Sequence, residues 1–390
     1  MTSAHHPHAA RPQARAEVRT RPAAPSPWIV AIDVGGSGSR LAAVRLAAGA
    51  DERRAGLAGR PVAVGPGGSD VAAVVHDLGA AFAAARSDAD GEPPVVVAAA
   101  VGATGVATLV PDPAAVHDAL RTSLGAGSTA VAADALTAHL GALGGRAGAV
   151  VAAGTGAIAL GTDLGRIWQR VDGWGHLLGD LGSASWIGAR GLRAALAAHD
   201  HRPTATSPAL LRAATARFGP VQTWPAQLYT RHDRAQVLGS FTPDVAAAAS
   251  DGDAAARQIL AAAGTHLAES LAAALVPDLP PRAAATGGVL AAGPALTTAL
   301  AHRFATLRPD AELLPCAGTP LDGALHLARR LAGSAARGPD GAARTSPHAG
   351  TVDPLVAHAP WLSINHHGRH PAARGTSRPT APTPTSGDPT

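Results

Sequence analysis

The sequence lacks lysine altogether and contains a single cysteine among its 390 residues. A P-loop needs the lysine of G-x-x-x-x-G-K-[ST], so no nucleotide site of that type is expected. Cys316 has no second cysteine to pair with, and one thiol alone does not hold zinc or an iron–sulfur cluster. Because no apolar run of about 18 residues occurs, we expect no membrane span and a cytoplasmic protein.

Aromatic residues make up only 3% of the sequence and charged residues only 15%, whereas hydrophobic residues make up 46%. These values are typical of a globular protein with a large core. The net charge of +4 comes from the ends, because residues 1–27 hold four Arg and one Glu and residues 334–390 hold five Arg and three Asp. The middle of the chain is nearly neutral, which argues against a nucleic-acid groove there.

The same two end segments, 1–27 and 334–390, are rich in Pro, Ala, Ser, Thr, Gly and His without periodicity, which predicts disordered tails. Between them, apolar strands that end in glycine turns alternate with helical patterns, which predicts an α/β fold. This stretch is longer than one core usually serves, so two domains are expected.

Two strand pairs with a glycine–hydroxyl turn, one near residue 28 and one after residue 145, suggest an internal duplication with a cleft between the halves. We place an N-terminal domain at 28–144, completed by a helix at 318–333. A C-terminal domain with a helical insertion is placed at 145–317.

Three glycine-rich turns, "DVGGSGS" (33–39), "AAGTGAIAL" (152–160) and "ATGGVLAAGPAL" (285–296), each follow an apolar strand. Glycine lets the backbone approach an anion closely, and neighbouring amides and hydroxyls can bind phosphate oxygens. Each turn alone is equally typical of a hairpin or a βα loop. Their occurrence together, in this order, favours a nucleotide gripped without a P-loop.

Two aspartates follow apolar strands. Asp33 could orient a hydrated Mg²⁺ that bridges the phosphates. Asp134, in "VAADALTAHLGA", could accept the proton of a substrate hydroxyl as it attacks phosphorus, or it could simply cap the helix that follows. A further glycine-rich stretch, "GWGHLLGDLGSASWIG" (173–188), leads into another helix, which Ser183 is expected to cap.

Four motifs occur in order: "AIDVGGSGSR", "AADALTAHLGA", "GTGAIALG…GWGHLLGDLGSASWIG" and "TGGVLAAGP". With them the chain, from about Trp28 to Gly333, resembles the N-acetylglucosamine kinases of the BadF/BadG-type ATPase family, in the sugar kinase, heat-shock ATPase and actin superfamily. The resemblance implies two actin-like ATPase (ribonuclease H-like) domains that close over ATP, Mg²⁺ and a sugar. It further implies phosphorylation of the 6-hydroxyl of an amino sugar, N-acetylglucosamine first.

The resemblance also implies roles for individual residues. Asp134 is the catalytic base, and Asp33 faces Mg²⁺ through water. The nucleotide contacts are Gly35, Gly36, Ser37, Ser39, Gly154, Thr155, Gly156, Gly287, Gly288 and Gly293. The sugar contacts are Gly68, Gly102, Asp134, Thr155, Trp174, Gly175 and Asp180.

Three positions depart from the family pattern: Gly38 stands where a basic residue is usual, Leu181 where a Glu is usual, and Gly68 where an Asn touches the sugar. The last two leave glucosamine or another hexose open as the substrate. The family also contains ATPase activators of 2-hydroxyacyl-CoA dehydratases, but their cluster needs more cysteines than Cys316. A non-catalytic sugar sensor is a further alternative. The expected partner is a small sugar, with no nucleic acid and no membrane, and a homodimer stays open.

Overall fold

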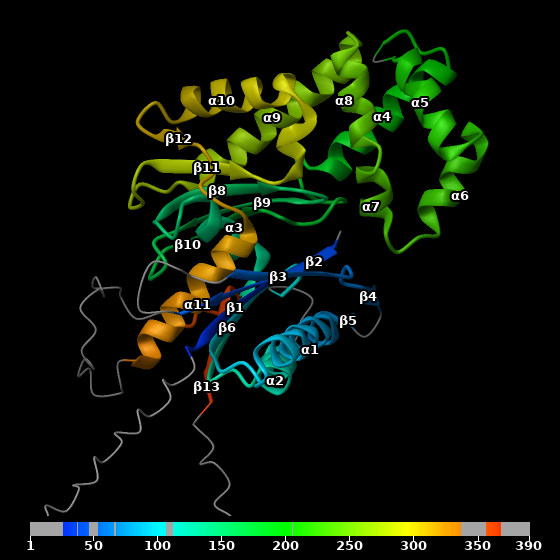
Figure 1. Cartoon of the computed structure of the whole chain (residues 1–390). Helices are drawn as coiled ribbons and strands as arrows, with labels where there is room; N and C mark the ends of the chain where they lie inside the picture. The colour runs from blue at the N-terminus through cyan, green and yellow to red at the C-terminus, as the bar shows by residue number, and fades with distance from the viewer. Residues whose placement is uncertain are drawn as a thin grey trace, which may run out of the picture.

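The computed structural model describes residues 26–36, 38–46, 54–65, 68–106, 112–204, 206–336 and 356–367. Two large sheets and one two-stranded sheet form within these residues, and helices cover the two large sheets (Figure 1). The predicted α/β fold class is therefore confirmed. No helix in these ranges is both long and apolar enough to cross a bilayer.

The first sheet has six strands in the order β13-β7-β6-β1-β2-β3. Their bounds are β1 Trp28–Gly35, β2 Gly38–Arg45, β3 Arg54–Gly59, β6 Val96–Ala103, β7 Ser128–Ala133 and β13 Leu362–His366. Strands β1, β6 and β7 run parallel. Because both faces of these central strands are covered, they appear in the sequence as continuous apolar runs rather than alternating patterns.

Helices α1 (Val71–Asp90) and α2 (Ala114–Leu124) cover one face of this sheet, where Trp28 and Phe82 meet edge to face. Helices α3 (Asp134–Ala142) and α11 (Pro320–Ala336) cover the other face. Leu325, Leu327 and Leu331 of α11 are buried against this sheet.

The second sheet has five strands in the order β10-β9-β8-β11-β12. Their bounds are β8 Gly148–Ala153, β9 Ala157–Thr162, β10 Trp168–Asp172, β11 Arg282–Thr286 and β12 Glu312–Leu314. Helices α9 (Ala254–Ala274) and α10 (Pro294–Leu307) belong to the core on one face. Helix α3 contacts the other face, so α3 lies between the two sheets (Figure 1).

The pair α3 and α11 packs closely because of two glycines. A Cβ at Gly141 would collide with the backbone of Thr319, and a Cβ at Gly323 would collide with the backbone of Thr137. Any larger residue at either position would push the helices apart, so this inter-sheet layer depends on both glycines.

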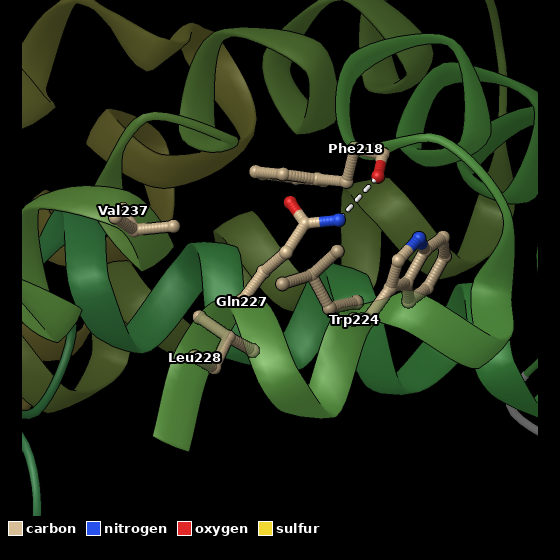
Figure 2. A pocket seen from close by; sticks show the side chains of 6 residues that line it. Phe218, Trp224, Gln227, Leu228 and Val237 are labelled. Carbon is tan, nitrogen blue, oxygen red and sulfur yellow. Dashed lines mark hydrogen bonds between the residues drawn. The ribbon is translucent and has the colours of Figure 1, made fainter. Parts of the chain in front are cut away.

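A helical region follows β10, as expected from the sequence. It contains α4 Ala184–His199, α5 Pro208–Phe218, η1 Val221–Thr223, α6 Trp224–Tyr229, α7 Arg234–Gly239 and α8 Thr242–Ser250. Figure 2 shows a small apolar pocket inside it, where the amide of Gln227 donates a hydrogen bond to the carbonyl of Phe218 over 2.7 Å. Three short elements complete the described fold: β4 Val64–Gly65, β5 Gly68–Ser69 and η2 Gly288–Ala292.

The C-terminal tail corrects the prediction made from the sequence. Residues 356–367 are not disordered, because β13 pairs antiparallel with β7 at the edge of the first sheet. Trp361 is buried, and both Trp361 and His358 stack on Trp168 of the second sheet. The aromatic stack and the strand pairing stabilise a segment whose composition resembles that of a flexible tail. Residues 1–25, 337–355 and 368–390 lie outside the described part of the chain.

Candidate active site

The first glycine turn joins β1 to β2, with Gly35 and Gly38 paired across the hairpin. Gly36 is exposed, and Ser37 lies outside the described residues. Ser39 is buried, and its hydroxyl donates a hydrogen bond to the carbonyl of Arg60 over 2.7 Å. Ser39 therefore stabilises the base of the turn, and phosphate binding by this hydroxyl stays a prediction.

Three parallel strands bring polar groups to one edge of the first sheet. Asp33 lies near the end of β1, Thr104 follows β6, and Asp134 follows β7. Because parallel strands end at the same edge, residues distant in sequence converge there. The sequence predicted both aspartates but missed Thr104, whose only signal was its place directly after the strand "VVAAAVGA".

Asp33 is half-buried and makes no hydrogen bond through its side chain with another described residue. Burial and the neighbouring Asp134 carboxylate raise the pKa of Asp33 to about 6, and Arg40 opposes this shift. A carboxylate that is partly desolvated beside a second carboxylate is stabilised by a nearby cation. Mg²⁺ prefers oxygen ligands and is commonly held by one or two carboxylates together with water and phosphate, so these residues fit it.

Asp134 is held by two hydrogen bonds. Its Oδ2 accepts from the hydroxyl of Thr104 over 2.9 Å, and its Oδ1 accepts from the amide of Ala135 over 2.8 Å. Burial raises the pKa of Asp134, and these hydrogen bonds partly offset that effect. Helix α3 begins at Asp134 itself, after Ala133, which has no side chain that could cap the helix. The Asp134 carboxylate accepts one amide of that first turn, a contact of the kind that a capping residue makes, and its catalytic role stays a prediction.

The second glycine turn, Gly154 to Gly156, joins β8 to β9 in the other sheet. The carbonyls of Gly154 and Thr155 accept hydrogen bonds from the amides of Ala184 and Ser185, at the start of α4. Ser183 caps that helix as predicted, accepting from the amide of Trp186. The turn is thus fixed to the helix that follows the glycine–tryptophan stretch.

Asp180 lies directly behind this turn. A Cβ at Gly156 would come within 2.8 Å of the Asp180 carboxylate, so only glycine leaves that carboxylate in place. Asp180 is 8% exposed and its φ is +55°, in the left-handed region. Burial raises the pKa of Asp180, and the repulsion from Asp172 raises it further.

The sequence missed Asp172, which fixes the loop that carries Asp180. The two oxygens of its carboxylate accept hydrogen bonds from the amides of Asp180 and Leu181, both at 2.8 Å. Trp174 is 63% exposed, and the guanidinium of Arg170 stacks 4.1 Å from its ring centroid. The backbone amide of Gly175 donates a hydrogen bond to the Asp180 carboxylate over 3.3 Å.

The third glycine turn meets the second. A Cβ at Gly287 would collide with the backbone of Ala153, the residue before Gly154, and the φ of Gly287 is +107°. At Gly288 and Gly293 a Cβ would meet no atom within 4 Å, so both face open space. The structure thus brings the second and third turns together, and nucleotide binding by them stays a prediction.

Gly68 and Gly102 have different surroundings. Gly68 lies in the hairpin of β4 and β5 with a φ of +100°, beside a Ser69 hydroxyl that is buried without a described hydrogen-bond partner. Gly102 is buried within β6, where a Cβ would collide with the side chain of Thr137. The packing of α3 explains this glycine, and sugar contacts at both positions stay predictions.

Comparisons with known proteins identify the family of the chain. The sequence model of the BadF/BadG/BcrA/BcrD ATPase family matches residues 30–316. The chain therefore belongs to this family, and membership of an ATPase family implies the use of ATP.

Three individual proteins are similar. Over 91 residues the chain is 36% identical to the N-acetylmuramic acid/N-acetylglucosamine kinase of Clostridium acetobutylicum, a match that spans 23% of this chain and only 30% of that protein. A candidate N-acetylglucosamine kinase from Chromobacterium violaceum is 25% identical, with a TM-score of 0.57 over 78% of this chain and 99% of its own. A candidate N-acetylglucosamine kinase from Porphyromonas gingivalis is 18% identical, with a TM-score of 0.56 over 77% and 97% of the two chains. The actin-like ATPase fold implied by the sequence motifs is confirmed by these structures.

Proposed function

We propose that the protein is an ATP- and Mg²⁺-dependent sugar kinase that phosphorylates the 6-hydroxyl of an amino sugar, with N-acetylglucosamine as the first candidate. The observation that carries the proposal is the half-buried pair Asp33 and Asp134, with raised pKa values, at the strand ends beside the first glycine turn. Family membership and the names of the similar proteins support the same reaction.

Asp134 acts as the base in this proposal. As the sugar oxygen bonds to the γ-phosphorus of ATP, the bond from that phosphorus to the oxygen of ADP breaks, and the hydroxyl proton passes to Asp134. The raised pKa makes Asp134 a stronger base than an ordinary aspartate. Thr104 and the amide of Ala135 orient the carboxylate, which leaves its remaining lone pairs for the substrate.

Asp33 would hold the magnesium ion through water. Bound there, the ion would neutralise charge on the phosphates as the bond to ADP breaks. The amides of the first two glycine turns would bind phosphate oxygens, and Gly287, Gly288 and Gly293 would line the base and ribose. A Cβ at Gly288 or Gly293 would meet no atom of a described residue within 4 Å, which supports room for a ring there.

The sugar would lie against the loop that Asp172 supports. Asp180 would accept hydrogen bonds from sugar hydroxyls or from an amino or amide group, and Thr155 and Gly175 line the same region. The Trp174 ring, held by Arg170, would offer an apolar face to the sugar. Because Asp180 is a buried carboxylate, the ammonium of glucosamine is a specific alternative partner.

The sugar is identified by comparing kcat/KM for N-acetylglucosamine, glucosamine, N-acetylmannosamine and glucose, measured as ADP release. Gly68→Asn restores a side chain able to hydrogen-bond the sugar, so we expect it to improve kcat/KM for N-acetylglucosamine roughly tenfold, the value of about one hydrogen bond. Because the φ of Gly68 is +100°, the melting temperature of Gly68→Asn is measured as well. A micromolar KM in the wild type, with no gain in a Gly68→Asn variant that melts like the wild type, would place Gly68 outside the sugar site. Binding of ATP with no sugar-stimulated ADP release would overturn the kinase assignment.

A further inference from the structure

Helix α7 of the helical region reaches the first glycine turn of the opposite sheet. The amide nitrogen of Gln236 lies 3.6 Å from the position that a Cβ would take at Gly36. Gln236 and Gly36 are 200 positions apart in the chain. Among the described residues, and apart from the chain neighbours of Gly36, no other atom lies within 4 Å of that point. Figure 1 shows α7 descending from the helical region toward β2, whose first residue, Gly38, lies at the turn.

Gln236 has hydrogen-bonding capacity to offer there. Its side chain is exposed and makes no hydrogen bond with any described residue. The side-chain amide of a glutamine carries two N–H donors. Since Gly36 has no side chain, the space between its backbone and the Gln236 amide stays open. An oxygen of an anion placed over the turn can therefore receive a hydrogen bond from each side.

The helix that carries Gln236, α7, packs closely against α4, and α4 is hydrogen-bonded to the second glycine turn. A Cβ at Gly188 of α4 would collide with the carbonyl of Leu238, and a Cβ at Gly239 would come within 3.3 Å of Ala184. Ala184 and Ser185 in turn donate their amides to the carbonyls of the second turn. The second turn, α4 and α7 are thus linked by direct contacts.

The opposite side of α7 is packed less tightly. Val237 faces the apolar pocket of the helical region, together with Leu228 and Gln227 of α6 (Figure 2). Helix α7 therefore packs against α4, whose first residues hold the second glycine turn, while Gln236 lies beside the first turn.

We propose that Gln236 is a nucleotide-binding residue that donates a hydrogen bond from its side-chain amide to a phosphate oxygen of ATP lying over the first glycine turn. This inference rests on the proposed ATP site. Gln236 would thus supply a hydrogen-bond donor to the phosphate from α7. At Gly38, where a basic residue is usual in the family, there is no side chain to supply one. A hydrogen bond to a charged phosphate is stronger than a neutral one, so its loss is measurable.

The test compares Gln236→Ala and Gln236→Glu with the wild type by calorimetric titration with Mg²⁺-ATP and by steady-state kinetics. We expect Gln236→Ala to weaken ATP binding about tenfold and Gln236→Glu to weaken it further, because a carboxylate repels phosphate. The KM for the sugar and the melting temperature should stay within error in both. Gln227→Ala, on the adjacent α6, is the control and should leave the Kd for ATP unchanged.

An unchanged Kd for ATP in both Gln236 variants would overturn the inference, as would an equal loss in Gln227→Ala. Because binding is measured directly, the result does not depend on finding the right sugar. A wild type that binds ATP but phosphorylates no sugar would overturn the proposed function alone. The effect of the Gln236 variants on the Kd for ATP would still test whether Gln236 binds the nucleotide.

Discussion

At the scale of single residues, the negative charges of Asp33 and Asp134 are electrostatically unfavourable in the folded protein. Both carboxylates have raised pKa values because they are desolvated, and Asp33 also feels the charge of Asp134. Titratable side chains with strongly shifted pKa values are frequent at functional sites, where they bind a ligand or take part in the reaction. A cation beside Asp33 would remove much of the cost.

The first prediction concerns pH. The pKa of Asp33 is about 6 in the folded state against 3.8 for an ordinary aspartate. Between these values the folded state holds a proton that the unfolded state has lost, so this group makes stability fall as pH rises from about 4 to 6. At pH 7.5 without Mg²⁺, Asp33→Asn should therefore be more stable than the wild type by about 1–3 kcal/mol.

Chemical denaturation at pH 4 and pH 7.5 checks this, and the two proteins should differ little at pH 4. Adding Mg²⁺ at pH 7.5 should stabilise the wild type more than Asp33→Asn. A wild type more stable than the variant at pH 7.5 without metal would contradict the assignment of the raised pKa to Asp33.

At the scale of elements, the loop from β10 to α4 depends on one carboxylate. Asp172 holds the amides of Asp180 and Leu181, while Asp172 and Asp180 both adopt left-handed backbone conformations. Such conformations are unfavourable outside glycine and persist only where the surroundings enforce them. The position of Asp180 is therefore set by Asp172 as much as by its own sequence neighbours.

We predict that Asp172→Ala raises the KM for the sugar at least about tenfold, because two hydrogen bonds to a charged group are lost and Asp180 shifts. Asp163→Ala is the matched control, since Asp163 also accepts two backbone amides at 2.8 Å, in the turn between β9 and β10. Both variants should lower the melting temperature. Only Asp172→Ala should change the sugar KM, and equal effects on KM would contradict the role of the loop.

Local sequence patterns predicted many of the helices and strands. The apolar runs of β1, β6, β7 and β8 are visible in the sequence, as are the glycine turns after β1 and β8 and the cap of α4 at Ser183. Thr104 and Asp172 were missed, because a Thr after a strand or an Asp before a glycine has no pattern of its own. Their roles come from the tertiary contact with Asp134 and Asp180.

At the scale of the whole molecule, the C-terminal segment joins the two sheets. Strand β13 pairs with β7, and the carbonyl of Trp361 accepts a hydrogen bond from the amide of Ala133, next to Asp134. The rings of Trp361 and His358 stack on Trp168 in β10. The sequence could not predict this, because a lone strand of five residues within a Pro- and Gly-rich stretch is stabilised only by its distant partners.

We predict that truncation after residue 355 lowers the melting temperature by about 5 °C or more, because a buried tryptophan and a paired strand are lost. Truncation after His367 keeps β13 and is the control, expected to melt within about 1 °C of the full chain. Differential scanning calorimetry of the three proteins decides it. Equal melting temperatures for the two truncations would show that β13 contributes nothing.

The measurement that tests the central claim most directly is phosphoryl transfer itself. Phosphorus NMR of the wild type with Mg²⁺-ATP and N-acetylglucosamine should show ADP and a sugar 6-phosphate appearing in equal amounts. Asp134→Asn should bind ATP and sugar normally but form product about 10²- to 10⁴-fold more slowly, since it lacks the base. Formation of ADP and inorganic phosphate without any sugar phosphate, or a near-normal rate in Asp134→Asn, would contradict the account.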